Sequence, residues 1–352
     1  MIRDRVAFVV RRLAAGVFAV WAMVTITFFI YWAIPTEPAT FVYPNVSHLT
    51  NEEIQHAHHV LGIDRPLLTQ YGDYLWHLLH FDFGGSWNTL QVSALQTFHE
   101  APVKPLLEME TRETLSIILG GAVLVLLLAI PLGAIAGRRI GSITDRTISL
   151  VALIAVCTHP MVVALMLRTI FGDRLHWLPP TGYCQFGHFA GNSCSGPGPW
   201  AEHLILPWIT FALLFLALYI RMVRISFHET LQEDFIRTAR ANGVSENRIM
   251  RRHVLPNAGI TLLTMIGMEI ATAIGVCIYI ESAFGIYGLG NATIQAMFGT
   301  LDLPRVLGIV TAITIIVVVG NLIVDILYVV VDPRAGTTRR ERGTKSLAGG
   351  VI

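Results

Sequence analysis

The histidines between residues 56 and 80 are the first side chains in this sequence whose types and spacing could do chemistry. His56, His58 and His59 lie in one short stretch, and His77 and His80 lie in a second. Histidines three residues apart can share one helix face and bind a metal ion through their ring nitrogens. No cysteine or close carboxylate completes a set of four ligands. A solvated helix face is therefore the favoured interpretation, and no metal site is predicted.

Two cysteines could form a cross-link. Cys184 and Cys194 lie close together in segment 172–203, which contains several Gly, Ser and Pro residues. In an oxidising compartment such a pair forms a disulfide that closes a small loop, and two free thiols are the alternative. Cys157 and Cys277 lie inside apolar stretches, where a cysteine packs like a small apolar side chain.

Three ionisable residues, Arg168, Glu269 and Asp325, interrupt long apolar stretches. Such groups normally face a pathway or a partner, because placing a charge in lipid is costly. Glu269 lies near the middle of its stretch and is the better candidate for a pathway residue, with burial against a partner subunit as the alternative. Asp325 lies near the end of its stretch and could pair with Arg334 or with a neighbouring helix.

The sequence lacks the motifs of several enzyme classes. It has no G-x-x-x-x-G-K-[ST] motif, and neither Lys104 nor Lys345, the two lysines, follows a suitable glycine. His-Glu-x-x-His, Gly-x-Ser-x-Gly and paired acidic motifs are also missing. We therefore predict that this chain is not an enzyme and binds no cofactor itself.

The composition shows what kind of elements must position these residues. Apolar residues make up 53% of the 352 residues and charged residues only 14%, with a mean hydropathy of +0.59. These values argue against a soluble globular enzyme and against a disordered chain. The net charge of +1 gives no indication of nucleic-acid binding. Six segments contain the roughly 20 apolar residues that a membrane-spanning helix needs: 13–35, 115–137, 147–171, 204–220, 258–281 and 306–331.

The basic residues predict the orientation of these helices. Nineteen of the 25 Arg and Lys residues fall on one side, in the N-terminus, loop 138–146, loop 221–257 and the tail. Because basic residues concentrate in cytoplasmic segments, both termini and loop 221–257 are predicted to be cytoplasmic. The first span is longer than a signal-peptide core and no small-residue cleavage site follows it, so we expect it to be retained.

The segment outside the membrane, 36–113, is predicted to form short helices. Thr50 and Glu53 have the spacing of a capping box, and apolar residues then recur at helical spacing up to Gly62. A second amphipathic stretch covers 67–79. Along the chain we expect four parts: a cytoplasmic N-terminus with the first span (1–35), an extracytoplasmic segment (36–113), a five-helix core (114–331) and a cytoplasmic tail (332–352).

The cytoplasmic loop 221–257 is too long for a plain connection between two spans. Residues 229–241 are amphipathic and helix-forming, and Gly243 permits the positive φ that ends a helix. A second helix can begin near Ser245, with Glu246 in its first turn. Two short helices joined at a glycine predict a rigid protrusion on the cytoplasmic side.

This loop resembles the EAA loop of ABC importer permeases, with Thr238-Ala239 near the small pair, Gly243 and Leu255-Pro256 downstream. The wider string DFIRTARANGVSENRIMRRHVLPNA resembles the oligopeptide, dipeptide and nickel branch of that family. Other matching stretches are spread along nearly the whole chain: LGIDRP at 61–66, FDFGGS at 81–86, LPPTGY at 178–183, ESAF at 281–284, GLG at 288–290 and DPR at 332–334. The 184–202 insertion with its two cysteines departs from the family pattern.

The resemblance implies an all-α polytopic membrane protein with six transmembrane helices and the type I ABC importer permease fold. It implies a permease subunit in the bacterial inner membrane that imports di- or oligopeptides. Its partners would be a homologous second permease, two ATPase subunits that hold ATP and Mg, and an extracytoplasmic substrate-binding protein. The implied ATPase coupling residues are Asp234, Arg237, Thr238, Ala239, Arg240, Gly243, Leu255 and Pro256. The candidates for the pathway or an outer gate are Glu269, Glu281, Gly288 and Gly290.

Alternatives of other classes are less consistent with the sequence. A secondary transporter is expected to show inverted repeats and matched broken helices, and the two halves of this chain do not look alike. A channel remains an alternative on hydropathy, although no repeated pore loop is present. For the solute, nickel or another small molecule is the alternative to a peptide.

Overall fold

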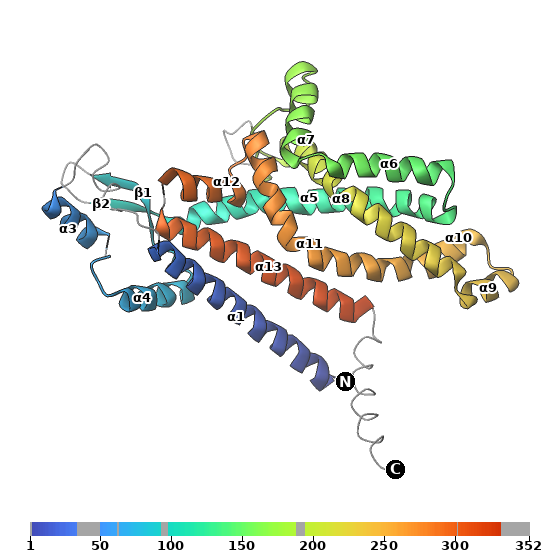
Figure 1. Ribbon diagram of the computed structural model, residues 1–352, viewed down its shortest axis with the longest axis horizontal. Coiled ribbons are helices and arrows are strands. Elements are labelled where there is room, and N and C mark those ends of the chain that lie inside the picture. Colours follow the sequence, from blue (N-terminus) through green and yellow to red (C-terminus); the bar gives the residue numbers. More distant parts are fainter. Residues whose placement is uncertain are drawn as a thin grey trace, which may run out of the picture. The chain divides into compact units, whose positions relative to one another are not determined.

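The computed structural model describes residues 2–33, 50–61, 63–92, 98–187, 194–300 and 302–331. The described chain is mostly helical (Figure 1). It divides into two compact units. The first unit contains the chain up to Gly16, Ser116–Ile286 and the chain from Val317 onward. The second unit contains Val17–Leu115 and Tyr287–Ile316.

Five described helices are long and apolar enough to cross a membrane, or six spans if one bent helix pair is counted as a single span. The long helices are α1 (Ile2–Ala33), α5 (Val103–Arg138), α8 (Pro197–Gln232), α11 (Leu255–Phe284) and α13 (Leu303–Val331). Four of them contain a whole predicted span, and α1 contains the described part of the first, up to Ala33. The helices extend beyond the predicted limits because polar residues at their ends also adopt helical structure.

The third predicted span, 147–171, is not one straight helix. It is divided between α6 (Ile143–Cys157) and α7 (Pro160–Leu167), which is continued by the π-helical turn η1 (Arg168–Arg174). The two parts meet at an angle of 101°. Proline disfavours helical structure in the residue before it, and His159 accordingly has extended dihedral angles. The His159 ring accepts a hydrogen bond from the Met161 amide and so caps the new helix.

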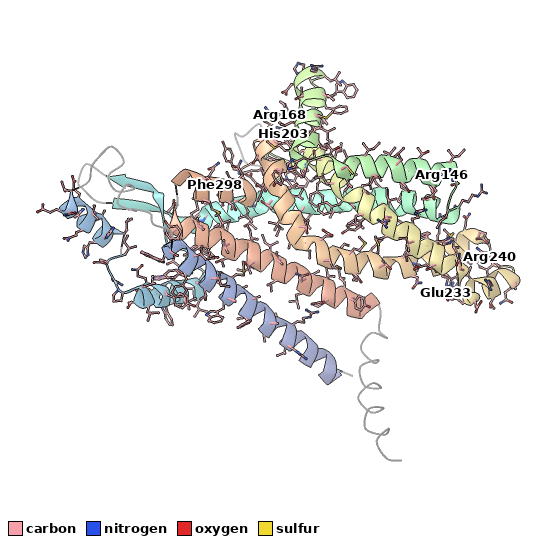
Figure 2. All side chains as sticks on the ribbon, viewed as in Figure 1. Arg146, Arg168, His203, Glu233, Arg240 and Phe298 are labelled. Carbon is pink, nitrogen blue, oxygen red and sulfur yellow. A yellow bond between two sulfur atoms is a disulfide. The ribbon has the colours of Figure 1, made fainter. Side chains whose placement is uncertain are left out.

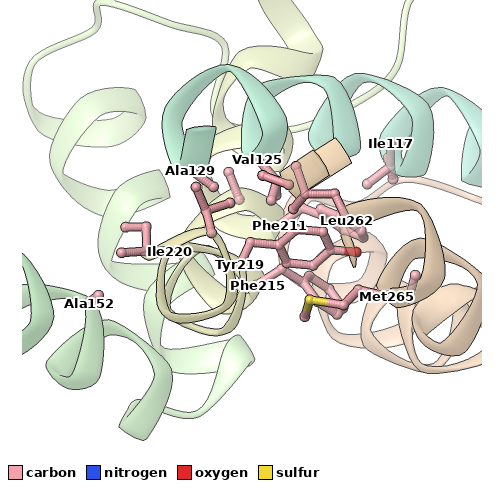
Figure 3. Close-up of a cluster of buried hydrophobic side chains, with 14 of the residues drawn as sticks. Ile117, Val125, Ala129, Ala152, Phe211, Phe215, Tyr219, Ile220, Leu262 and Met265 are labelled. Atoms are coloured by element: carbon pink, nitrogen blue, oxygen red, sulfur yellow. The ribbon is translucent and has the colours of Figure 1, made fainter. Parts of the chain in front are cut away.

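The core of the first unit is formed where α5, α8 and α11 meet. Phe211, Phe215 and Tyr219 follow one face of α8 and are all nearly fully buried. Figure 3 shows these rings between α5 and α11, beside Leu262 and Met265. The spacing of three or four residues puts these aromatic side chains on one stripe of the helix.

Two ion pairs hold other parts of the first unit together. Asp325 of α13 pairs with Arg12 of α1 at 3.0 Å, so its partner is on a neighbouring helix. Arg334, the other predicted partner, lies outside the described residues. Asp145, at the start of α6, pairs with Arg224 of α8 and also accepts a hydrogen bond from the Gly141 amide. This pair fixes the α5–α6 connection against α8.

The second unit contains the short elements of the predicted outer segment. Helix α3 begins at the expected capping box, because the Thr50 hydroxyl accepts from the Glu53 amide and the Glu53 carboxylate accepts from the Thr50 amide. The hydrogen bonds that the Thr50 amide and hydroxyl donate to the Glu53 carboxylate lower the pKa of Glu53. The predicted stop at Gly62 lies outside the described residues. The elements of this unit are α3 (Asn51–Val60), α4 (Leu67–Leu79), β1 (Gly85–Val92), β2 (Phe98–Pro102), α12 (Leu289–Ile294) and η3 (Gln295–Thr300).

An antiparallel pair of strands is the departure from the all-helical prediction. Strands β1 and β2 pair in a register that places Gly85 opposite Pro102, with an irregularity between Ser86 and Gln91. The Ser86 hydroxyl donates to the fully buried Asp302 carboxylate at 2.5 Å. A buried carboxylate needs such a partner, so this contact fastens the first strand to the start of α13.

Candidate functional site

The first candidate site is the segment between α8 and α11, where the sequence predicts the coupling loop. Helix α8 ends at Gln232 rather than continuing, and Glu233 has the extended dihedral angles of a helix N-cap. The predicted helix 229–241 is therefore divided, and its second part is α9 (Asp234–Ala241). The break at Glu233 turns the chain out of the direction of α8.

Helix α9 has one buried and one exposed face. Ile236 is fully buried in the core of the first unit, whereas Phe235 is 47% exposed. Asp234, Arg237, Thr238 and Arg240 are also exposed, and Ala239 is half-buried against the core. Ala239 therefore contacts this chain's own core with part of its surface. The exposed aromatic ring of Phe235 was missed in the sequence.

A tight turn joins α9 to α10 (Glu246–Ile249). Gly243 has φ +74°, the left-handed conformation that glycine adopts without a steric penalty. Arg240 donates to Glu246 across the turn at 2.6 and 3.4 Å, and this bond raises the pKa of Arg240. Ser245 is the N-cap residue of α10, as predicted. The turn therefore fixes the two short helices relative to each other.

The chain returns to the membrane through the π-helical turn η2 (Met250–Val254). Leu255 and Pro256 form the first turn of α11, where a proline is tolerated because its missing N–H has little effect. Asn257 donates to the Thr230 hydroxyl at 3.0 Å and so ties α11 to the end of α8. The coupling segment, defined here as residues 233–257, is thus anchored at both ends.

The coupling segment lies at one end of the first unit. Figure 2 shows Glu233, Arg240 and Arg146 at that end, and Arg168 and His203 at the other. Arg168 donates to the Ala283 carbonyl at 2.7 Å and so ties η1 to α11.

The predicted cysteine pair lies at the opposite end from the coupling segment. The structure joins Cys184 and Cys194 in a disulfide with 5.0 Å between their Cα atoms. The His203 Nδ1 atom lies 3.3 Å from the Cys184 sulfur and 2.8 Å from the Pro199 carbonyl oxygen. Among the described residues, one group of at least three potential metal ligands is found, and it consists of Cys184, Cys194 and His203. Its two sulfur atoms are already bonded to each other.

The histidines of the second unit have partners of their own. His59 pairs with Asp64 at 2.9 Å and His77 pairs with Asp82 at 3.1 Å, both on exposed surfaces. The hydrogen bond from His59 lowers the pKa of Asp64. His80 bonds to the carbonyl of Trp76. These contacts match the solvated helix faces expected from the sequence.

The second candidate site is a small, mostly apolar pocket of about 70 Å³ in the first unit. It contains Glu269, the residue that the sequence marks as a pathway candidate. Its walls come from α5, α8 and α11. The pocket is lined by Ile118, Ala122, Val125, Leu126, Phe211, Phe215, Tyr219, Ile266, Glu269, Ile270 and Ala273.

The predicted gate residues lie in both units. Glu281, in the first unit, is fully buried near the end of α11. The left-handed residue that ends this helix is Gly285, with φ +65°. In the second unit, Gly288 has an extended backbone and caps α12, and Gly290 is buried. The Leu289 amide donates to the Thr114 hydroxyl at 2.8 Å and thereby fixes this turn on α5.

The sequence matches the model of the family described as "Binding-protein-dependent transport system inner membrane component" over residues 129–337. Residues 5–88 match the N-terminal component of the same transport systems. The chain therefore belongs to this family of inner-membrane permease components. Members of the family are subunits of ABC transporters and are not themselves the ATPases.

Named relatives cover almost the whole chain. A putative peptide transport system permease protein of Brucella abortus is 30% identical over 328 residues, covering 93% of this chain and 98% of the relative. The oligopeptide transport system permease protein AppB of Bacillus subtilis is 29% identical, covering 93% and 98%. The similarity thus extends over nearly the whole of each chain.

A solved structure shows the fold. A chain of the MetNI methionine ABC transporter in an inward-facing conformation superposes with a TM-score of 0.51 at 19% identity, covering 64% of this chain and 96% of that one. The predicted type I ABC importer permease fold is thus confirmed.

Proposed function

We propose that this chain is the permease subunit of an ATP-driven importer of di- and oligopeptides. The observation that carries this proposal is the similarity, over 93% of this chain, to relatives named as peptide permeases. The coupling segment supports it, because a rigid cytoplasmic protrusion is the element that a permease without an ATP-binding motif needs.

The proposed complex contains this chain, a homologous second permease, two ATPase subunits that bind ATP and Mg, and an extracytoplasmic binding protein. The proposed orientation places both termini and the coupling segment in the cytoplasm. The basic residues at the coupling end of the first unit support this orientation. The disulfide supports it as well, because it lies at the opposite end, where an oxidising compartment is expected.

Nickel is less well supported as the solute. The histidines that first indicated a metal are paired with carboxylates or backbone on exposed surfaces. A metal site needs several convergent ligands, and the described lining of the Glu269 pocket offers one carboxylate and one phenol. A peptide is therefore the favoured cargo.

Uptake by the reconstituted complex tests the proposal. Proteoliposomes with both permeases, the ATPases and the binding protein are loaded with ATP, and accumulation of a labelled tripeptide and of Ni²⁺ is measured. We expect tripeptide uptake that stops when the ATPase P-loop lysine is replaced. Uptake of Ni²⁺ without the tripeptide, or tripeptide uptake by a complex that lacks this chain, contradicts the proposal.

A further inference from the structure

Helix α4 presents an apolar stripe that the described chain leaves largely exposed. Leu68, Trp76 and Leu79 are each between 64% and 75% exposed. At 3.6 residues per turn, the three side chains lie within about 80° of one another around the helix. Phe81, just after the helix, is exposed as well. A patch of large apolar side chains of this kind marks a surface that another molecule or a membrane covers.

A second stripe of α4 holds the helix on its own chain. The Tyr71 hydroxyl lies 2.6 Å from the Thr25 hydroxyl of α1. The rings of Tyr71 and Tyr74 lie 5.4 and 6.1 Å from the Phe28 ring. Figure 1 shows α4 beside the end of α1. These contacts fix which side of α4 remains exposed.

A third stripe of α4 is polar and contains Gln70, Asp73 and His77 at helical spacing. Asp73 pairs with Arg65 at 3.1 Å, and His77 pairs with Asp82 at the same distance. The four side chains of these pairs are each more than half exposed, so this stripe is hydrated. A helix with a hydrated stripe beside an exposed apolar one is typical of a helix that lies in a membrane interface.

The level of α4 along the spans indicates which surface covers the apolar stripe. Phe28 and Tyr31, from the last two turns of α1, pack with Leu303 and Leu307, from the first turns of α13. The two tyrosines of α4 pack against the same cluster. Since α1 and α13 are both long and apolar enough to cross a bilayer, α4 lies where two spans leave the membrane.

Aromatic residues with a polar atom gather at this level. Trp and Tyr are enriched where a membrane protein passes from hydrocarbon to water, because one end of the ring is apolar and the other can bond to water. The residues of this type on α4 and the end of α1 are Tyr31, Trp32, Tyr71, Tyr74 and Trp76.

The exposed side of α1 continues toward α4. Ile26, Phe29 and Ile30 are exposed apolar residues of this span, and the Phe29 ring lies 5.5 Å from the Tyr71 ring. The apolar stripe of α4 therefore extends a surface that a spanning helix already presents.

Helix α3 provides a contrast within the same predicted outer segment. Its exposed residues are all polar: Asn51, Glu52, Gln55, His56 and His59. The apolar stripe is thus a property of α4 and not of the segment as a whole.

We propose that α4 is an interfacial helix whose Leu68, Trp76 and Leu79 insert into the outer leaflet of the bilayer. It places part of the predicted extracytoplasmic segment in the membrane interface and anchors the adjoining ends of α1 and α13 there. The choice of leaflet rests on the proposed orientation, whereas the contact with lipid does not.

Spin-label accessibility in the full complex, reconstituted in proteoliposomes, tests this inference. A nitroxide is attached to Leu68→Cys or Leu79→Cys in the Cys157→Ser and Cys277→Ser background, and its collisions with O₂ and with water-soluble chromium oxalate are measured. Gln55→Cys, an exposed position on α3, is the matched control. The ratio of O₂ to chromium collisions at positions 68 and 79 should exceed the ratio at position 55 about tenfold, because hydrocarbon excludes a charged complex.

Photocrosslinking identifies the molecule that touches the stripe. Trp76 is replaced by p-benzoylphenylalanine, an aromatic residue that inserts into neighbouring C–H bonds on irradiation, and the complex is placed in vesicles with radiolabelled phospholipid. The radiolabel should become attached to this chain and remain after denaturation. The same replacement at Gln55 should attach no label.

Two results overturn the inference. Chromium collisions at positions 68 and 79 that equal those at position 55 place the stripe in water. Low collision rates with both reagents show that protein covers the stripe, and a cross-link from position 76 then names the subunit. Neither measurement involves peptide uptake, so failure of the proposed function leaves this inference standing. Labelling of Gln55→Cys in intact cells by an impermeant maleimide tests the orientation separately.

Discussion

At the scale of single residues, Gly243 determines the shape of the coupling segment. Its φ of +74° is unfavourable for any residue with a branched side chain, although no atom lies near enough to obstruct a Cβ. The strain in a variant would therefore come from the backbone and not from a collision.

Gly243→Val is expected to destabilise the turn by about 1–3 kcal/mol, the usual cost of a strained backbone conformation. The spans should remain inserted, while co-purification of the ATPase falls. Gly259→Val is the matched control, since Gly259 also has open space around its Cβ position but no positive φ. Equal ATPase yields from the two variants argue against this role for Gly243.

Cys184 and Cys194 provide a test of both the disulfide and the orientation. In a variant with Cys157→Ser and Cys277→Ser, a membrane-impermeant maleimide should label intact cells only after reduction. The bridge is expected to stabilise its loop by about 2–3 kcal/mol in the chain-entropy model. Labelling of both cysteines without reductant excludes the bridge.

At the scale of elements, α9 has two faces with different roles. The fully buried Ile236 holds the helix on the core, and the exposed Phe235 is available to a partner. Large aromatic side chains at the centre of an interface often contribute most of its binding energy.

Phe235→Ala should therefore leave the chain as abundant as wild type but weaken ATPase binding by about 2 kcal/mol. Ile236→Ala, one position along, should instead lower the stability of the first unit by about 2–5 kcal/mol through loss of buried volume. Thermal unfolding and ATPase pull-down are measured for both. A Phe235→Ala complex with wild-type ATPase affinity rules out this face as the contact.

The turn at α12 is the predicted outer gate. Gly290 is buried, so a valine there must displace its neighbours at a cost of about 1–3 kcal/mol. Gly290→Val should impair peptide uptake while the complex stays assembled, as judged by size-exclusion chromatography and uptake in parallel. Wild-type uptake in this variant would remove the gate assignment.

Elements with strong local signals could be predicted from the sequence. The apolar segments, the capping box at Thr50 and the turn at Gly243 each follow from residues that are close together in the chain. The 101° bend before Pro160 was missed because the average hydropathy of 147–171 stays high despite Thr158, His159 and Pro160. The paired strands were missed because their pairing depends on residues distant in the sequence, such as Asp302.

The candidate site was predictable to a similar extent. Loop 221–257 shows its helices and its glycine in the sequence, but which face of α9 is buried depends on contacts with the spans. Glu269 can be recognised in the sequence because it is a charged residue within an apolar stretch. The aromatic residues that line the same pocket belong to α8, about fifty positions earlier, and could not be assigned to it from the sequence. Contacts of this kind are fixed by packing and leave no local pattern.

At the scale of the whole molecule, we expect residues 233–257 of this permease to form the contact with the ATPase. In the first unit, the coupling segment and the disulfide lie at opposite ends (Figure 2). A protein partner in the cytoplasm can therefore reach only one of these ends.

Cross-linking between this chain and the ATPase tests that claim most directly. In the variant lacking Cys157 and Cys277, a cysteine replaces either Arg237, on the exposed face of α9, or Arg174, at the opposite end of the first unit. A membrane-permeant reagent with one maleimide and one benzophenone is added to vesicles that import the tripeptide, the vesicles are irradiated so that the benzophenone inserts into C–H bonds of the nearest protein, and the products are separated by electrophoresis. The account predicts a cross-link to the ATPase from Arg237→Cys and none from Arg174→Cys. A cross-link from Arg174→Cys, or none from Arg237→Cys in vesicles that still import the peptide, contradicts it.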